Sequence, residues 1–193
     1  MTESLDAALD ERREQIKKAA LKVFAERGIS GAKMSLIAEE AGISQGLSYR
    51  YFRSKEELFT LLVQEAVEES QSAIRSLREQ PGTAVERLAH FTRRMMDESH
   101  RHIFLLLQHA QRSDDVPEPA KVWVNRYSPQ DVLEQLVPIF IEGQQAGDFR
   151  EGDPRAHLLL YFSVVTGLML QEAPTAQGWL PEVDNLLRLI RRL

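Results

Sequence analysis

Apolar residues recur three or four positions apart along nearly the whole chain, and no segment alternates apolar and polar residues with a period of two. That spacing places apolar side chains on one face of an α-helix. A first helix is expected over 10–27, with Gly28 ending it because glycine adopts the left-handed conformation at little cost. Further helices are expected over 83–99, 102–112, 129–146, 154–172 and 181–193, with loops over 113–118 and 174–178. The chain is therefore predicted to be all-α, with about nine helices.

Two short helices are predicted over 35–41 and 45–52, joined by the turn AGIS over 41–44. Gly42 suits a tight turn, and Ser44 can cap the second helix. Two short helices joined in this way have the form of a helix-turn-helix.

The next helix begins with the sequence SKEE, in which Ser54 and Glu57 have the spacing of a capping box. The Ser54 hydroxyl should bond the Glu57 amide, and the Glu57 side chain should reach back. Pro and Gly at 81–82 end this helix. We therefore expect an N-terminal three-helix head over 10–55 and a C-terminal helical body over 56–193.

Charge is unevenly distributed along the chain. The formal net charge is −5, yet residues 12–55 hold ten lysines and arginines against four glutamates. A basic head on an acidic body can attract phosphates locally. The alternative interpretation is a solvated charged surface with no nucleic-acid role.

Several classes of protein are disfavoured by the composition. The absence of cysteine removes disulfides, thiolate catalysis and cysteine-based zinc sites. No serine elbow, phosphate loop, Rossmann glycine pattern or cluster of metal ligands occurs, so we expect neither an enzyme nor a cofactor. The apolar stretch 158–170 is short and interrupted by Ser163, Thr166 and Gly167, which predicts a buried helix and no membrane association. The acidic N-terminus lacks a signal-peptide pattern, so a cytoplasmic location is expected.

Between 16 and 67 the sequence resembles the DNA-binding domain of the TetR family. The matching residues occur in order: Ala19, Ala20, Phe24 to Gly28, Ile37, Ala38, Ala41 to Ser44, Gly46, Tyr49, Tyr51, Phe52 and Ser54 to Phe59. The resemblance implies a helix-turn-helix head and a body that dimerises and senses a ligand. It also implies a ligand-responsive repressor that binds a palindromic operator in double-stranded DNA and releases it when a small molecule binds the body. An activator remains possible, and the alternative is a helical small-molecule-binding or protein-interaction module without DNA activity.

The predicted recognition helix can be divided into two faces. With Ser44 as cap, Ser48 and Phe52 should point inward, one turn apart. The outward residues and their expected roles are Gln45 for adenine or phosphate, Leu47 for a thymine methyl, Arg50 for guanine or phosphate, and Gly46 for close approach of the backbone. The order Leu47-Ser48 inverts the family's usual small-polar then apolar order, and Lys33 stands where threonine is common. Both departures bear on base preference.

Phosphate contacts are expected around this helix. Tyr49 and Tyr51 resemble the family's phosphate-contacting tyrosines, and Lys55 lies at a helix N-terminus, where free amides favour an anion. Lys33 and Ser35 flank the start of the second helix. The alternative is that the tyrosines are packing residues and Lys55 is a solvated charge. The predicted DNA-binding residues are Lys33, Ser35, Ser44, Gln45, Gly46, Leu47, Tyr49, Arg50, Tyr51 and Lys55.

The helix predicted over 154–172 is apolar on most faces and should be buried on all sides. Pairing it and the last helix with their copies across a two-fold axis would bury them in a homodimer, where Gly167 permits close approach. The alternative is a helix central to a monomer core. The predicted interface residues are Leu158, Phe162, Val165, Met169, Leu186, Leu187 and Ile190.

A ligand site in the body is expected to be mostly apolar with a few polar groups. The candidate residues are Phe91, Arg94, Met95, Phe104, Trp123, Tyr127, Phe140 and Phe162, with His90, His100 and His109 as further polar groups. Core packing or surface exposure is the alternative for each of them. The composition of the set favours an apolar or aromatic effector. Such an effector would act by favouring a state whose two recognition helices are not spaced by one DNA turn, about 34–36 Å.

Overall fold

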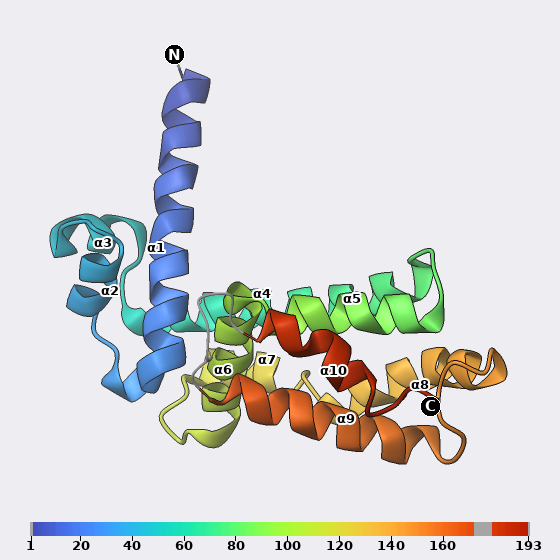
Figure 1. Cartoon of the computed structure of the whole chain (residues 1–193). Helices are drawn as coiled ribbons and strands as arrows, with labels where there is room; N and C mark the ends of the chain where they lie inside the picture. Colours follow the sequence, from blue (N-terminus) through green and yellow to red (C-terminus); the bar gives the residue numbers. More distant parts are fainter. Residues whose placement is uncertain (1, 172–178, 193) are drawn as a thin grey trace. The chain divides into compact units, whose positions relative to one another are not determined.

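A computed structural model describes residues 2–171 and 179–192 of the chain, and within these ranges the regular elements are helices (Figure 1). The helices are α1 (Thr2–Gly31), α2 (Met34–Glu40), α3 (Gln45–Tyr51), α4 (Lys55–Glu79), α5 (Ala84–Met96), α6 (Glu98–Arg112), α7 (Glu118–Val124), α8 (Pro129–Gln145), α9 (Pro154–Met169), the 3-10 helix η1 (Leu180–Glu182) and α10 (Val183–Leu187). In the described part of the chain, β pairing is limited to an isolated bridge between Phe149 and Arg191. The predicted all-α class is confirmed.

The chain forms two compact units, each with its own core. Unit 1 comprises Met1–Val67 and His102–Arg126, and unit 2 comprises Glu68–Arg101 and Tyr127–Leu193. By packing, most of α6 and all of α7 therefore belong with the N-terminal helices. The functional division at 55/56 remains a prediction.

Unit 1 is built around the apolar face of α1. Ile16 and Phe24 are fully buried there, and the Phe24 ring meets Phe59 of α4 edge-on, with centroids 5.1 Å apart. Gly28 interrupts the helix with φ +62° and ψ 179°, which confirms the predicted end of its regular part.

The start of α4 is capped nearly as predicted. The Glu57 amide donates to the Ser54 hydroxyl over 3.1 Å. The Glu57 carboxylate does reach back, but it accepts from the amide of Arg53 over 2.8 Å. The free amides at this helix N-terminus are therefore partly satisfied by the protein itself.

Unit 2 packs α5, α8 and α9 around an apolar core that contains a few buried polar groups. The Thr92 hydroxyl donates to the Leu88 carbonyl and shares a 2.9 Å hydrogen bond with the Tyr161 hydroxyl. Burial raises the pKa of Tyr161 to about 12, although the hydrogen bond with Thr92 and the charge of Arg93 act in the opposite direction.

Several helix predictions differ from the structure. Helix α1 begins at Thr2, eight residues before the predicted start at 10. The break between α5 and α6 falls at Asp97, so α6 begins four residues earlier than the predicted 102. Helix α7 was not predicted; its start is marked by Pro117 at the N-cap position and a second proline in its first turn. Helix α9 ends at Met169, three residues before the predicted end at 172. The predicted loop over 174–178 lies outside the described residues.

The predicted long helix over 181–193 is wrong, because regular helix ends at Leu187. The chain then turns back toward the segment after α8. The Arg150 amide donates to the Ile190 carbonyl and the Arg192 amide donates to the Asp148 carbonyl, each over 2.9 Å. None of the described helices combines the length and apolar character that crossing a membrane requires.

Candidate nucleic-acid interface

The turn between α2 and α3 is held by contacts from α1. The Gln15 side chain donates to the Ala41 carbonyl over 2.6 Å, and the Lys22 ammonium pairs with Glu40 over 2.8 Å. Gly42 has φ +65°, a conformation that favours glycine. The turn is therefore fixed both by its own backbone and by α1.

The inner face of α3 has the predicted register. Ser44 is the N-cap and accepts from the Leu47 amide over 3.3 Å. Ser48 is fully buried, and its hydroxyl donates to the Gln45 carbonyl over 2.8 Å. This bond within the helix satisfies the serine at a packing position. Phe52 is also buried, as predicted.

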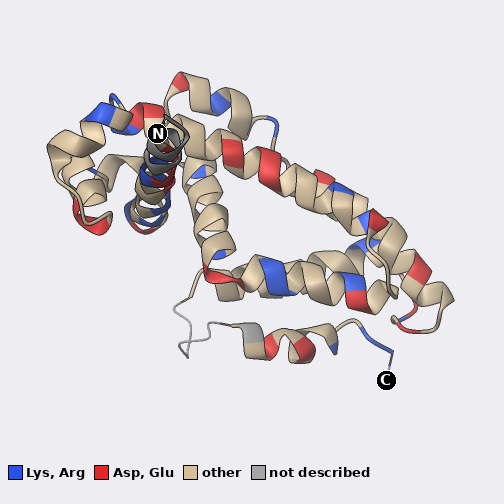
Figure 2. Cartoon of the chain, turned by 90° about the horizontal axis from the view of Figure 1, so that it is seen from above, with Lys and Arg blue, Asp and Glu red and all other residues tan. Residues whose placement is uncertain are grey.

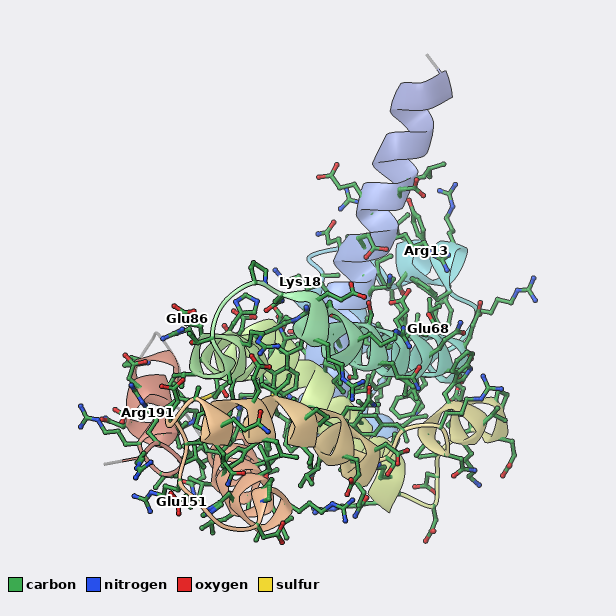
Figure 3. All side chains as sticks on the ribbon, turned by 90° about the vertical axis from the view of Figure 1, so that its right-hand side faces the viewer. Arg13, Lys18, Glu68, Glu86, Glu151 and Arg191 are labelled. Atoms are coloured by element: carbon green, nitrogen blue, oxygen red, sulfur yellow. The ribbon has the colours of Figure 1, made fainter. Side chains whose placement is uncertain are left out.

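A cation covers the buried ring at the end of α3. The Arg13 guanidinium lies 4.8 Å from the centroid of the Phe52 ring, a separation typical of cation–π contact. Arg13 extends from α1 on the side where α3 lies (Figure 3). It binds α1 to the far end of the recognition helix, and no local motif in the sequence marks it for this role.

The outer face of α3 presents polar side chains to solvent. Ser44, Gln45, Gly46, Tyr49 and Arg50 are exposed. Leu47 and Tyr51 are half-buried, so each offers only part of its side chain. An amide, a guanidinium and a phenol on one exposed helical surface supply the donors and acceptors that read base edges and phosphates.

Gly46 has no structural reason to be glycine within the described protein. A Cβ built at this position meets nothing within 4 Å, and its φ is not positive. Glycine inside a helix is less stable than alanine by roughly 0.5–1 kcal/mol. The residue therefore fits the predicted role of letting another molecule approach the backbone closely.

The predicted phosphate-binding residues have different surroundings. Lys33 and Ser35 are exposed at the start of α2. Lys55 is half-buried, and its ammonium donates to the carbonyls of Ile29 over 2.8 Å and Ala32 over 3.0 Å. Lys55 is thus neither a freely solvated charge nor an open anion site. Its backbone-bridging contacts could not be read from a local motif.

Both signs of charge are present on α1. Seen from above, α1 carries basic and acidic residues close together, and Lys18 projects from it (Figures 2 and 3). Some of the basic groups are paired: the Lys17 ammonium lies 2.9 Å from Glu14 and 2.8 Å from Glu65. Burial acts to lower the pKa of Lys17, but the hydrogen bonds to Glu65 and Glu14 outweigh it and raise the pKa. Part of the local positive balance is thus neutralised inside unit 1.

The predicted dimer residues need correction. Six of the seven are buried within unit 2: Leu158, Val165, Met169, Leu186, Leu187 and Ile190. The seventh, Phe162, is half-buried. A side chain buried in its own core leaves no surface for a partner. The exposed face of α9 instead carries Leu159 at 61%, Leu160 at 63% and Val164 at 37% exposure.

The predicted ligand-site residues are divided between the two units. Phe104 and Trp123 belong to unit 1, and the other six belong to unit 2. In unit 2, the Phe91 and Phe162 rings meet edge-on, 6.0 Å apart. Phe140 lies elsewhere in the packing, stacked on Phe149 at 4.7 Å. The structure thus brings together one pair of the predicted aromatic residues.

Two of the four polar candidates of the ligand site, Arg94 and His100, form a cluster with Glu69. The Arg94 guanidinium donates to Glu69 and to His100 Nε2, each over 2.9 Å. Met95 and Tyr127 are half-buried, and burial raises the pKa of Tyr127. His90 is exposed on α5, and His109 belongs to unit 1. Among the described residues, no cluster of three or more His, Cys, Asp or Glu has the arrangement of a metal site.

Comparison with known proteins bears on the head more than on the body. The family described as "Bacterial regulatory proteins, tetR family" matches residues 16–62. The HTH-type transcriptional activator FasR of Mycolicibacterium smegmatis is 42% identical over 66 residues, which cover 34% of this chain and 30% of that protein. The fatty acid metabolism regulator protein of Bacillus subtilis is 29% identical over 143 residues, covering 72% of this chain and 71% of that protein. The chain spans about a third of the length of the first curated relatives it matches, between 30% and 36%.

The fold is shared over nearly the whole length. The ketosteroid transcriptional regulator KstR2 of Mycobacterium tuberculosis superposes with a TM-score of 0.71 at 21% identity, covering 94% of this chain and 96% of that chain. The family match falls on the helix-turn-helix described above, and the remaining helices follow the layout of this regulator. The helix-turn-helix head, residues 16–62, therefore matches the tetR family of bacterial regulatory proteins.

Proposed function

We propose that this protein is a transcriptional regulator that binds a palindromic operator in double-stranded DNA through α3. The observation that carries the proposal is the pre-formed recognition surface. Helix α3 is capped by Ser44, its inner face is closed by Ser48 and Phe52, and its outer face is polar and exposed. The match of residues 16–62 to a family of bacterial regulatory proteins supports the same conclusion. Because an operator-binding protein must reach the chromosome, we place it in the cytoplasm.

Within this proposal the DNA-binding function lies in residues 10–55 and the regulatory functions in 56–193. Gln45 and Arg50 read base edges, helped by Leu47, while the exposed phenol of Tyr49 and the exposed ammonium of Lys33 contact phosphates. Tyr51 and Ser35 flank these contacts. Repression is the mode we propose; the activator named among the relatives keeps activation as the second candidate.

We propose a homodimer formed through the exposed face of α9. Leu159, Leu160 and Val164 lie on that face, and Ile141 of α8, the helix that packs beside α9, is 39% exposed. A contiguous exposed apolar surface marks an interaction site, and a two-fold axis would pair it with its own copy. A Cβ at Gly167 meets nothing within 4 Å, which leaves room for a partner helix. A dimer also supplies the two heads that a palindrome requires.

A small-molecule effector, apolar or aromatic, is proposed to bind the body and favour a state with poor operator affinity. The paired rings of Phe91 and Phe162 and the polar group of Arg94, all in unit 2, are the described features that support this class. Binding must be stronger in the DNA-released state, since a ligand shifts an equilibrium only by its differential affinity. A calorimetric screen that finds only polar or charged binders would contradict the proposed class.

The deciding experiment is a gel-shift titration with the DNA upstream of the protein's own coding sequence. We expect specific binding in which the logarithm of the affinity falls linearly with the logarithm of the salt concentration. The slope should be about −0.9 for each phosphate that the protein neutralises. Gln45→Ala should reduce the preference for operator over random DNA by at least about tenfold, in line with the worth of a bidentate base contact. Gln145→Ala, the same change at an exposed position in α8, is the matched control and should bind like the wild type.

A protein of the second class, a helical binding module without DNA activity, would give the opposite result. It would show no preference for the upstream DNA in either variant, and its weak residual binding would not depend on Gln45. Sedimentation at micromolar concentration tests the dimer separately, and a monomer would reject it.

A further inference from the structure

The C-terminal end of α1 accepts hydrogen bonds from side chains of two other helices. Gly28 interrupts α1, and carbonyls near a helix end lack regular helical donors. Three of these carbonyls accept side-chain donors: those of Ala25, Ile29 and Ala32. We name these three carbonyls the α1-end acceptors. All three residues are buried, and their hydrogen bonds to the two side chains are partly buried.

Lys55 satisfies two of these acceptors from the first residue of α4. Its ammonium bridges the Ile29 and Ala32 carbonyls over 2.8 and 3.0 Å. A cation is stabilised at a helix C-terminus and destabilised at an N-terminus. By sequence position Lys55 lies at the N-terminus of α4, but its charge lies at the end of α1. Because α3 ends at Tyr51, only a few residues separate this bridge from the recognition helix.

His109 satisfies the third acceptor from α6. Its Nε2 lies 3.1 Å from the Ala25 carbonyl. A carbonyl oxygen can only accept, so Nε2 must carry the proton. The imidazole also lies against Gly28, where a Cβ would stand 3.4 Å from Nδ1. The Ser30 hydroxyl donates to the Asp115 carboxylate and adds a second link between the end of α1 and the segment after α6.

We propose that Lys55 and His109 are positioning residues for operator binding, which act through the α1-end acceptors and need not touch DNA. The inference rests on the proposed function. By fixing the end of α1 between α4 and α6, the two side chains fix the helix that holds the recognition turn through Gln15 and the Ala41 carbonyl. Lys55 thereby differs from its predicted role as a phosphate contact.

Salt dependence of operator binding separates the two roles of Lys55. A lysine that neutralises a phosphate contributes to the slope of log affinity against log salt, whereas a positioning lysine lowers affinity at every salt concentration alike. We expect Lys55→Gln to weaken operator binding at least fivefold with the wild-type slope. Lys33→Gln is the matched control, since Lys33 is exposed, and should reduce the slope by about 0.9 per head. The proposal is overturned if Lys55→Gln reduces the slope of log affinity against log salt as much as Lys33→Gln does. It is also overturned if Lys55→Gln leaves operator affinity unchanged.

Two substitutions test the role of His109. His109→Phe keeps a ring against Gly28 but removes the donor, and should weaken operator binding at least fivefold with unchanged slope. His109→Gln places an amide N–H near the position of Nε2 and should restore most of that loss. Wild-type affinity in His109→Phe, or equal losses in the Phe and Gln variants, overturns the role of the donor.

Hydrogen exchange distinguishes failure of this inference from failure of the proposed function. In DNA-free protein, the amides of α3 should exchange faster in Lys55→Gln and in His109→Phe than in wild type, and at the wild-type rate in Lys33→Gln. If wild type binds no operator, the proposed function fails while this measurement still tests the positioning. Unchanged exchange in α3 overturns the inference, and should Lys55→Gln not fold, the two His109 variants provide the same test.

Discussion

Replacing Gly46 by alanine should stabilise the protein and weaken operator binding. Gly46 is the second residue of α3, its φ is not positive, and a Cβ at that position meets nothing within 4 Å. The methyl group therefore costs nothing inside the protein and restricts the unfolded chain. The expected gain is about 0.5–1 kcal/mol in the free energy of unfolding, or about 1–4 °C in melting temperature for a chain of this length.

The same methyl group lies on the surface that we propose enters the DNA groove. We expect operator affinity to fall at least about tenfold while binding to random DNA changes little, because the extra volume displaces the base edges. Thermal unfolding and gel-shift titration of one preparation give both quantities. If Gly46→Ala binds the operator with wild-type affinity, the proposed close approach of DNA to this backbone is refuted. If Gly46→Ala has a lower melting temperature than the wild type, the conclusion that a Cβ fits at this position is refuted.

Gly42→Ala is the internal comparison because it should have the opposite effect on stability. A Cβ at Gly42 also meets nothing within 4 Å, but φ is +65°. A left-handed conformation costs a residue with a side chain roughly 1–2 kcal/mol. Alanine substitutions at two glycines four positions apart should thus change the free energy of unfolding in opposite directions. The reason is the backbone angle φ, which is positive only at Gly42 of the two.

Further predictions concern unit 2. Gly143→Ala should lower the free energy of unfolding by about 1–3 kcal/mol in urea titrations, because a Cβ there would lie 2.2 Å from Phe149 Cδ2; wild-type stability would contradict this. Burial raises the pKa of Tyr161 to about 12, so its protonated form is favoured in the folded state. The stability that this confers is present below the ordinary value near 10 and should be lost as pH rises toward 12, by about 2–3 kcal/mol, while Tyr161→Phe should show a flatter alkaline profile. Leu160→Asp, at a position 63% exposed, should sediment as a folded monomer at micromolar concentration, and a persistent dimer would exclude this face.

The head could be predicted well because its determinants are local. The cap at Ser44, the inward register of Ser48, the positive φ of Gly42 and the end of regular helix at Gly28 each follow from residues within about one helical turn. The error in the cap of α4 is small: the Glu57 carboxylate binds the amide of Arg53, one residue from the expected position. Local chemistry therefore determined the caps and the inner face of α3, whereas the contacts of Arg13 and Lys55 come from more distant residues.

The body could not be resolved in the same way because its helix faces are chosen by distant neighbours. Helix α9 is apolar nearly all round, so its sequence does not say which stripe faces α5 and α8. The prediction chose Leu158 and Val165, which are buried in unit 2, while their neighbours Leu159 and Leu160 are exposed. Successive residues of an α-helix are rotated by about 100° about its axis, so the buried and the exposed residues lie on different faces of α9. Only the packing partners decide between them.

An energetic comparison decides between two roles for Lys55: a contact to a DNA phosphate, or a bridge between two backbone carbonyls. Moving its ammonium to a phosphate would break two hydrogen bonds to the carbonyls of Ile29 and Ala32, residues that are 4% and 0% exposed. Leaving buried acceptors unsatisfied costs about 1–3 kcal/mol each. Lys33 is exposed and its side chain caps no helix, so a phosphate contact there breaks no such bonds. Of the two lysines, Lys33 is therefore the better phosphate ligand, and Lys55 contributes more to DNA binding by staying where it is.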